Sequence, residues 1–299
     1  MAMTRTSTLS SLAVCAVAAA GLWISPSDAQ TAQTATSSGG MVVTDQHIGS
    51  EVGRGVLDAG GNAIDAAVAI GYALAVVDPC CGNLGGGGFM TIHLANGKDT
   101  FINFRERAPL RATTNLYLDQ SGNVIPGLSL NGYLAVGVPG TVAGLEKARE
   151  AYGTLSRQVL MAPAIALADV GFTLDEGDIS VFSGSTATFQ QQPNVAAIFL
   201  KNGQAYQSGD RLVQHDLART LGQIALQGPQ AFYDGPIADQ IVAASNANGG
   251  ILSAQDLQQY TAEELEPVTC DYRGYHVVSS PPPSSGGTVI CEILNVLQG

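Results

Sequence analysis

The stretch GNLGGGGFMTIHLANGKDTFINFRERAP, residues 82–109, decides the fold. Two runs rich in β-branched and aromatic residues flank Asn96-Gly97, which is the preferred dipeptide of a two-residue hairpin turn. Counting back from this turn pairs Gly88 with Arg105, and paired residues share one face of a sheet. The sequence therefore predicts an antiparallel hairpin that ends with an arginine directly across from a glycine.

Four consecutive glycines precede the first strand of this hairpin, namely Gly85, Gly86, Gly87 and Gly88. Without a side chain at Gly88 the Arg105 guanidinium has room, and glycine lets backbone N–H groups approach a ligand closely. A planar fork of donors beside free amides suits a carboxylate. From the residues alone, an ordinary ion pair between Arg105 and Glu106 or another acid is equally open. A phosphate-binding loop is disfavoured, because no G-x-x-x-x-G-K-[ST] or G-x-G-x-x-G pattern occurs here.

Composition excludes some classes of partner. The chain has 299 residues, 45% of them hydrophobic, so it can bury a sizeable core, and its formal net charge is −12. This acidic balance argues against a nucleic-acid partner, since phosphate binding needs a basic face. Beyond the N-terminus, no apolar stretch is long enough for a transmembrane helix.

The first 29 residues are typical of a signal peptide. Arg5 supplies a positive charge, an apolar run follows, and Ser27-Asp28-Ala29 resembles a cleavage site. Residues 30–40 are rich in Ser, Thr, Gln and Gly and are predicted to be a disordered leader. We therefore expect an exported protein, periplasmic or secreted, with no membrane partner after cleavage and with its folded domain in residues 41–299.

Helical and hairpin patterns alternate along this domain. Residues 44–60 predict a helix with Thr44 or Asp45 as N-cap, and Asn62 caps a second, almost wholly apolar and therefore buried helix that ends before Pro79. Further helices are expected after Thr141, at 164–170, at 236–246 and from about 288, and a second hairpin turns at Arg273-Gly274. Because βαβ spacing is missing, we expect a layered α/β fold rather than a doubly wound parallel sheet.

Four cysteines remain after the predicted cleavage: Cys80, Cys81, Cys270 and Cys291. Export makes disulfides possible, but adjacent cysteines rarely bridge each other. No C-x-x-C motif indicates a metal or redox site. The favoured interpretation is four small apolar residues with free thiols.

The other titratable residues show no catalytic or metal-binding pattern, so we expect no metal site and no cofactor. The histidines His47, His93, His215 and His276 have no ligand spacing. Two acidic groups are interpreted as solvated loop charges; they are Glu263, Glu264 and Glu266, and Asp175, Glu176 and Asp178.

Six motifs occur in the order seen in γ-glutamyltranspeptidases, and the chain resembles that family from about Gly40 to its end. They are GGNAIDAAVAIGYALAVVDP, GNLGGGGFM, NFRERAP, GVPGTVAGL, AFYDGPIADQIV and PPPSSGGTVICEILNVL. The resemblance implies an exported N-terminal nucleophile hydrolase with an αββα sandwich. It also implies a precursor that cuts itself into a large and a small subunit. The expected reaction takes the γ-glutamyl group from glutathione or another γ-glutamyl amide and passes it to water, an amino acid or a peptide.

Arg105 matches the family arginine that binds the α-carboxylate of the γ-glutamyl substrate, with Gly85, Gly86, Gly87 and Gly88 as loop support. The family nucleophile is a threonine at the start of the small subunit, with its own α-amino group as base. That threonine follows the PPPSSGG region, so we expect no catalytic residue within this chain, which resembles most of a large subunit, cut before its end. Thr113-Thr114 is followed by Asn115 and is interpreted as an ordinary loop pair.

Two alternatives stay open. A related cephalosporin or glutaryl acylase shares these motifs, and the small-subunit residues that would discriminate the two activities are not in this sequence. An exported, non-catalytic binding module that uses the Arg105 pocket is the second alternative.

Overall fold

The computed structural model describes residues 34–299, so the predicted signal peptide and the start of the leader lie outside the described residues. Residues 34–39 carry no helix or strand, and Gly40–Gly299 form one compact unit. Within the described residues, no helix has the length and apolar character needed to cross a membrane.

The helical core is built around α2 (Ala63–Val77), which is buried along almost its whole length. Asn62 and Asp65 form the capping box that starts it, as the sequence predicts. Helices α1 (His47–Asp58), α3 (Thr141–Tyr152) and α4 (Arg157–Val170) pack around α2, and α8 (His215–Gln227) packs on α4. The predicted N-cap of α1 is wrong: Gln46 holds that position, because its side chain accepts from the Ile48 backbone N–H.

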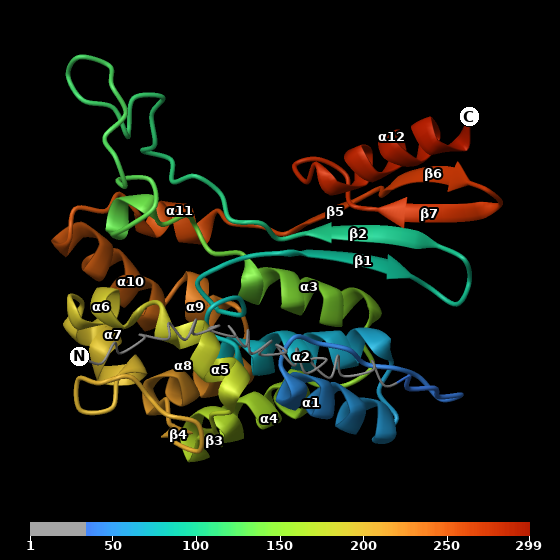
Figure 1. Cartoon of the computed structure of the whole chain (residues 1–299), viewed down its shortest axis with the longest axis horizontal. Coiled ribbons are helices and arrows are strands. Elements are labelled where there is room, and N and C mark those ends of the chain that lie inside the picture. Colours follow the sequence, from blue (N-terminus) through green and yellow to red (C-terminus); the bar gives the residue numbers. More distant parts are fainter. Residues whose placement is uncertain (1–33) are drawn as a thin grey trace, which may run out of the picture. The chain divides into compact units, whose positions relative to one another are not determined.

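A three-stranded antiparallel sheet lies beside this core, next to α3 in Figure 1. Its order is β1 (Phe89–His93), β2 (Asp99–Asn103) and β5 (Glu263–Leu265). Ile92 and Ile102 belong to the same hydrophobic core as the helices, so this face of the sheet packs on the helical layer. The layered α/β class is confirmed, and every strand pair within residues 34–299 is antiparallel.

The predicted register of the first hairpin is wrong by one residue. The loop contains Ala95, Asn96 and Gly97 rather than two residues: the Leu94 N–H donates to Lys98, and Gly97 has a φ of +83°. Such a three-residue loop, with glycine in the left-handed region, is a common hairpin connection. Phe89 consequently pairs with Asn103, and Gly88 exchanges backbone hydrogen bonds with Phe104, not with Arg105.

The shift moves Arg105 to the other face of the sheet, since the side-chain period of a strand is two. Phe89, Phe101 and Asn103 share the face of the sheet that points away from the helical layer. Arg105 comes two residues after Asn103, so it belongs to the same face. The Arg105 guanidinium accordingly lies 6.0 Å from the centre of the Phe89 ring.

Two of the four glycines, Gly87 and Gly88, allow close contact with Phe104. A Cβ at Gly87 would lie 2.4 Å from the carbonyl oxygen of Phe104 and 2.8 Å from the nitrogen of Glu106. A Cβ at Gly88 would lie 2.8 Å from the Phe104 ring. The expected space at Gly88 is therefore filled by Phe104, and Gly87 is the glycine that lies against the Arg105 backbone.

The remaining elements before the C-terminal part are mostly short. Two small strands pair with each other, β3 (Phe172–Thr173) and β4 (Arg211–Leu212). The helices are η1 (Tyr133–Ala135), α5 (Glu176–Ser183), α6 (Thr186–Gln190), α7 (Pro193–Phe199), α9 (Gln230–Tyr233), α10 (Pro236–Ala247) and α11 (Ala254–Gln258). Ser253 and Asp256 form a capping box at the start of α11.

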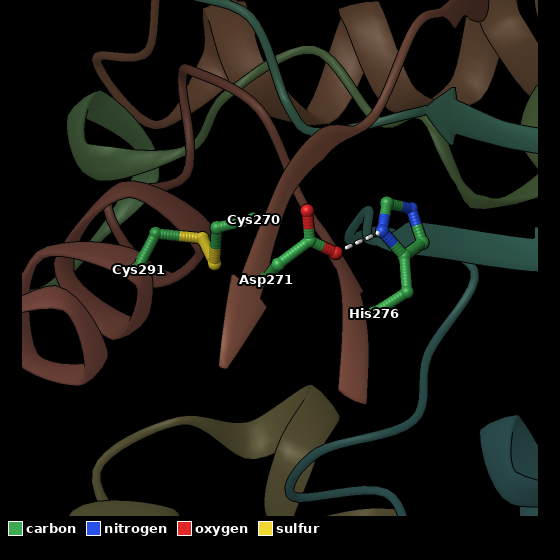
Figure 2. Close-up of a disulfide and its surroundings, with 4 residues drawn as sticks. All are labelled: Cys270, Asp271, His276 and Cys291. Carbon is green, nitrogen blue, oxygen red and sulfur yellow. Dashed lines mark hydrogen bonds and ion pairs between the residues drawn. A yellow bond between two sulfur atoms is a disulfide. The ribbon is translucent and has the colours of Figure 1, made fainter. Parts of the chain in front are cut away.

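The C-terminal part consists of β6 (Val268–Tyr272), β7 (Tyr275–Ser279) and α12 (Gly286–Gln298). Its two-residue turn at Arg273-Gly274 is confirmed, and both residues have positive φ. A disulfide between Cys270 and Cys291 joins β6 to α12, as Figure 2 shows.

The prediction of free thiols is wrong for all four cysteines, because Cys80 and Cys81 are also bonded to each other. The Cys270–Cys291 pair forms because α12 packs on β6 and brings the two Cα atoms to 5.9 Å, a separation that suits a disulfide.

The acidic residues interpreted as solvated loop charges are exposed except for Asp178, but most of them lie in a helix or strand rather than in a loop. Glu263 and Glu264 lie in β5, where Glu264 accepts hydrogen bonds from Thr100 and Tyr152. Asp175 and Asp178 form the capping box of α5. These carboxylates satisfy backbone or hydroxyl donors, which their position in the sequence did not reveal.

Glu146 links helices α3 and α4 through its ion pair with Arg157. It lies in α3, is 4% exposed, and accepts hydrogen bonds from Arg149 and from Arg157 at the start of α4. Burial alone would raise the pKa of Glu146, but the hydrogen bonds from Arg157 and Arg149 lower it to about 2. Because this pKa is depressed from 4.5, the stabilisation is complete above the ordinary value and is lost as the pH falls toward 2.

We predict that Glu146→Gln lowers the free energy of unfolding by about 3–5 kcal/mol at pH 7, because it leaves two partly buried arginines without their acid. Between pH 5 and pH 3 the wild type should lose more stability than the variant, a difference that urea unfolding at each pH measures. Glu51→Gln, at an exposed position of α1, is the control. Parallel pH profiles for wild type and Glu146→Gln would contradict the assigned role.

Candidate functional site

Arg105 lies two residues beyond Asn103, the last residue of β2, and its backbone is fixed on both sides. Its N–H donates to Oδ1 of Asn103 at 3.1 Å, and its carbonyl accepts from the Tyr260 hydroxyl at 2.8 Å. The residue itself is exposed. The backbone is thus held in place while the side chain stays accessible.

Tyr260 comes from a distant part of the chain, just after α11, and is 8% exposed. Its ring stacks on Tyr233, with 5.8 Å between centroids and 7° between planes. Burial raises the pKa of Tyr260 to about 12, against the opposing charge of Arg107, so its hydroxyl remains a donor at neutral pH. A Cβ at Gly140 would lie 2.2 Å from that hydroxyl, so the glycine makes the contact possible.

The charge of a second arginine, Arg107, is neutralised by an ion pair. Arg107 Nη2 lies 2.9 Å from Oε1 of Glu263, and the other oxygen of Glu263 accepts from the Asn103 amide at 3.2 Å. Among residues 34–299, by contrast, Arg105 takes part in no ion pair. The expected alternative of an ion pair between Arg105 and Glu106 is not found. A free guanidinium on a fixed backbone can bind a carboxylate bidentately.

The glycine loop passes beside Arg105. The Gly86 carbonyl accepts the N–H groups of Gly140 and Thr141, which ties the loop to the start of α3. In the part of the chain that the structure describes, no hydrogen bond uses the N–H of Gly85 or Gly87. Two backbone donors therefore remain available in the glycine loop, and Gly87 is the one that lies against the Arg105 backbone.

The expected cleft at Arg105 is not among the described cavities. A cavity of about 300 Å³ between α3 and α9 includes Tyr260 in its lining, and one of about 110 Å³ includes Arg107 and Tyr260, but Arg105 lines neither. The sequence did not single out Tyr260, because no local pattern marks it. Asn103 was also not predicted, since its position two residues before Arg105 is only a weak signal.

A third cavity, of about 420 Å³, lies where the residues before α1 meet the residues after α2 and the start of α5. We call it the aspartate cavity; its lining includes Asp45, Gln46, His47, Asp78, Cys80, Cys81, Asp175 and Asp178. Burial, reinforced by the neighbouring carboxylates, raises the pKa of Asp78 and of Asp178. Nothing in the sequence pointed to this concentration of negative charge.

The threonine pair and the four histidines, for which the sequence suggests no catalytic role, are all exposed. Thr113 and Thr114 are exposed in a loop. Each histidine lies beside one aspartate: His47 with Asp175, His93 with Asp99, His215 with Asp169, and His276 with Asp271, the last pair drawn in Figure 2.

Comparison with known proteins gives consistent results. The chain is 63% identical over 261 residues to the glutathione hydrolase proenzyme of Pseudomonas sp. strain A14, an alignment that covers 87% of this chain and 45% of that relative. It is 38% identical over 271 residues to the acylase ACY 1 proenzyme of Pseudomonas sp. strain V22, covering 89% of this chain and 49% of that one. The chain thus spans about half the length of the curated relatives it matches.

Among solved structures, the γ-glutamyltranspeptidase of Helicobacter pylori superposes with a TM-score of 0.87 at 46% identity, covering 89% of this chain and 76% of that one. The family model described as gamma-glutamyltranspeptidase matches residues 49–299. This match includes the glycine loop, the hairpin, Arg105 and Tyr260. The chain therefore belongs to the γ-glutamyltranspeptidase family.

Proposed function

We propose that this chain is the large-subunit part of an exported γ-glutamyltranspeptidase that acts on glutathione and other γ-glutamyl amides. The observation that carries the proposal is the Arg105 guanidinium, unpaired among the described residues, on a backbone fixed by Asn103 and Tyr260. The similarity to the glutathione hydrolase proenzymes of Pseudomonas sp. strain A14 and Escherichia coli supports both the substrate and a precursor that is processed into subunits.

In the proposed mechanism this chain binds and orients the substrate. The Arg105 fork receives the α-carboxylate, and the free N–H of Gly87, which lies against the Arg105 backbone, can add a donor. Holding this end of the substrate fixes the γ-carbonyl relative to the nucleophile, which lowers the entropic part of the barrier. The nucleophile is a threonine of the small subunit, which attacks the γ-carbonyl while its own α-amino group takes the proton.

An acylase activity on glutaryl amides is the second candidate, favoured by the 38% identity to the acylase proenzyme. A glutaryl group carries the same carboxylate as a γ-glutamyl group and differs in lacking the α-amino group. Arg105 therefore fits both substrates, and the relative rates on γ-glutamyl and glutaryl anilides decide between the two activities.

Residues 1–299 alone should not hydrolyse a γ-glutamyl anilide, whereas the protein expressed from its complete reading frame should, since the proposed nucleophile lies outside this chain. Release of the coloured anilide measures both. Turnover by the purified 299-residue chain that disappears in Thr113→Ala or Thr114→Ala would overturn this assignment. A complete protein without turnover on either anilide would favour the binding module.

Replacing Arg105 by lysine in the complete protein should lower kcat/KM for γ-glutamyl anilide on the order of 10- to 100-fold, because lysine cannot present the planar fork. Arg54→Lys, at an exposed position of α1, is the matched control and should leave kcat/KM unchanged. A value for Arg105→Lys within about twofold of wild type would remove the carboxylate role.

Tyr260→Phe should lower kcat/KM about 3- to 10-fold, because it removes one hydrogen bond to the Arg105 carbonyl while keeping the ring on Tyr233. A positioning role predicts that this loss nearly vanishes in an Arg105→Ala background, as a double-mutant cycle would show. Equal losses in both backgrounds would instead mean that Tyr260 acts only on general stability.

A further inference from the structure

The aspartate cavity places three metal-ligating residues together outside the proposed substrate site. Ligand atoms of Asp78, Cys80 and Cys81 all lie within 4.8 Å of one another, and Sγ of Cys80 is 3.2 Å from Oδ1 of Asp78. The Asp78 carbonyl accepts the N–H groups of Cys81 at 3.1 Å and Gly82 at 2.8 Å. This backbone turn fixes the aspartate beside the two sulfur atoms, so the three ligands come from four consecutive residues that are already folded together.

An independent observation comes from Gln46, which lines the same cavity and is 7% exposed. Its Oε1 accepts from the Ile48 N–H at 2.6 Å as the N-cap of α1, which fixes the amide. Its Nε2 is buried and has no hydrogen-bond partner among the described residues. A buried donor without a partner costs free energy. The Gln46 side chain opposes the rise in the pKa of Asp178, so its amide is directed at the carboxylates of this cavity.

We propose that Asp78, Cys80 and Cys81 form a redox-gated site for a thiophilic divalent cation of the zinc and cadmium class. Thiolate sulfur and carboxylate oxygen bind such ions at roughly 2.3 and 2.0–2.2 Å, so ligand atoms of one tetrahedral site lie about 3.3–3.8 Å apart. The Cys80–Asp78 separation is close to this range, and the two sulfurs reach it by moving apart once their bond is broken. The neighbouring carboxylates of the cavity attract a cation.

The gate is the Cys80–Cys81 disulfide, which ties up both sulfur ligands. A thiolate from a small-molecule thiol attacks one sulfur to give a mixed disulfide, and a second thiol releases the oxidised dimer and leaves two cysteine thiols. Binding of the divalent cation then displaces the two thiol protons. Cys80 and Cys81 are exposed and open to this attack, whereas Cys291 of the other disulfide is 8% exposed. Reduction should therefore begin at the vicinal pair.

The test is a cadmium titration of the complete protein before and after mild reduction and removal of the reductant under nitrogen. Reduced protein should bind about one Cd²⁺ per chain with an ultraviolet sulfur-to-cadmium absorption band, and unreduced protein should show no band. Thiol counting before the titration measures how far the vicinal pair has opened. A reduced protein that exposes these thiols and shows no band, or a vicinal pair that thiols cannot open, would overturn the proposal.

Variants assign the band to its ligands. Cys80→Ser/Cys81→Ser should abolish it, and Asp78→Asn should weaken cadmium binding by about 10- to 100-fold. Cys270→Ser/Cys291→Ser should keep the band and is the matched control. If that control does not fold, isotope-coded alkylation with and without Cd²⁺ gives the second readout, with protection expected at Cys80 and Cys81 only. A band or protection that persists without Cys80 and Cys81 would place the metal elsewhere.

Discussion

The structure depends on a close backbone contact between the glycine loop, the end of β2 and the start of α3. A Cβ at Gly87 would lie 2.4 Å from the carbonyl oxygen of Phe104, and a Cβ at Gly140 would lie 1.9 Å from the same oxygen. A Cβ at Gly144 would lie 2.0 Å from the Phe104 ring. The glycine loop and the start of α3 can approach Phe104 this closely only because each offers a glycine there. This contact sets where the strand ends, and hence where Arg105 stands.

The local parts of the fold follow from the sequence because their determinants are local. The Asn62–Asp65 capping box, the buried α2 and the turn at Arg273-Gly274 each depend on a few neighbouring residues. The register of the first hairpin did not follow, although Asn96-Gly97 is an equally strong turn signal. A two-residue and a three-residue loop can both place glycine at the left-handed position, and the choice between them depends on packing of Phe104 that only the whole fold provides.

The residues of the candidate site show the same contrast between local and long-range determinants. Arg105 could be singled out from the sequence, because its motif lies in one continuous stretch. Tyr260 could not, since it reaches the Arg105 carbonyl from 155 positions away. Cys270 and Cys291 likewise meet only when α12 packs on β6, and the carboxylates of the aspartate cavity come from three separate segments. Residue chemistry is visible in a sequence, but the juxtaposition of distant residues is a property of tertiary packing.

The two arginines of the FRER segment show how such packing assigns different tasks to identical side chains. Arg107 is held by Glu263 and lies over the Tyr260 ring, 5.5 Å from its centroid, so its charge is used within the protein. The second oxygen of Glu263 accepts a hydrogen bond from the Asn103 side-chain amide, and the side-chain oxygen of Asn103 accepts one from the Arg105 N–H. Both oxygens of this acid are thus engaged, and Glu263 offers no further oxygen to Arg105. The same short network that fixes the backbone of Arg105 therefore keeps its guanidinium free for a carboxylate from outside.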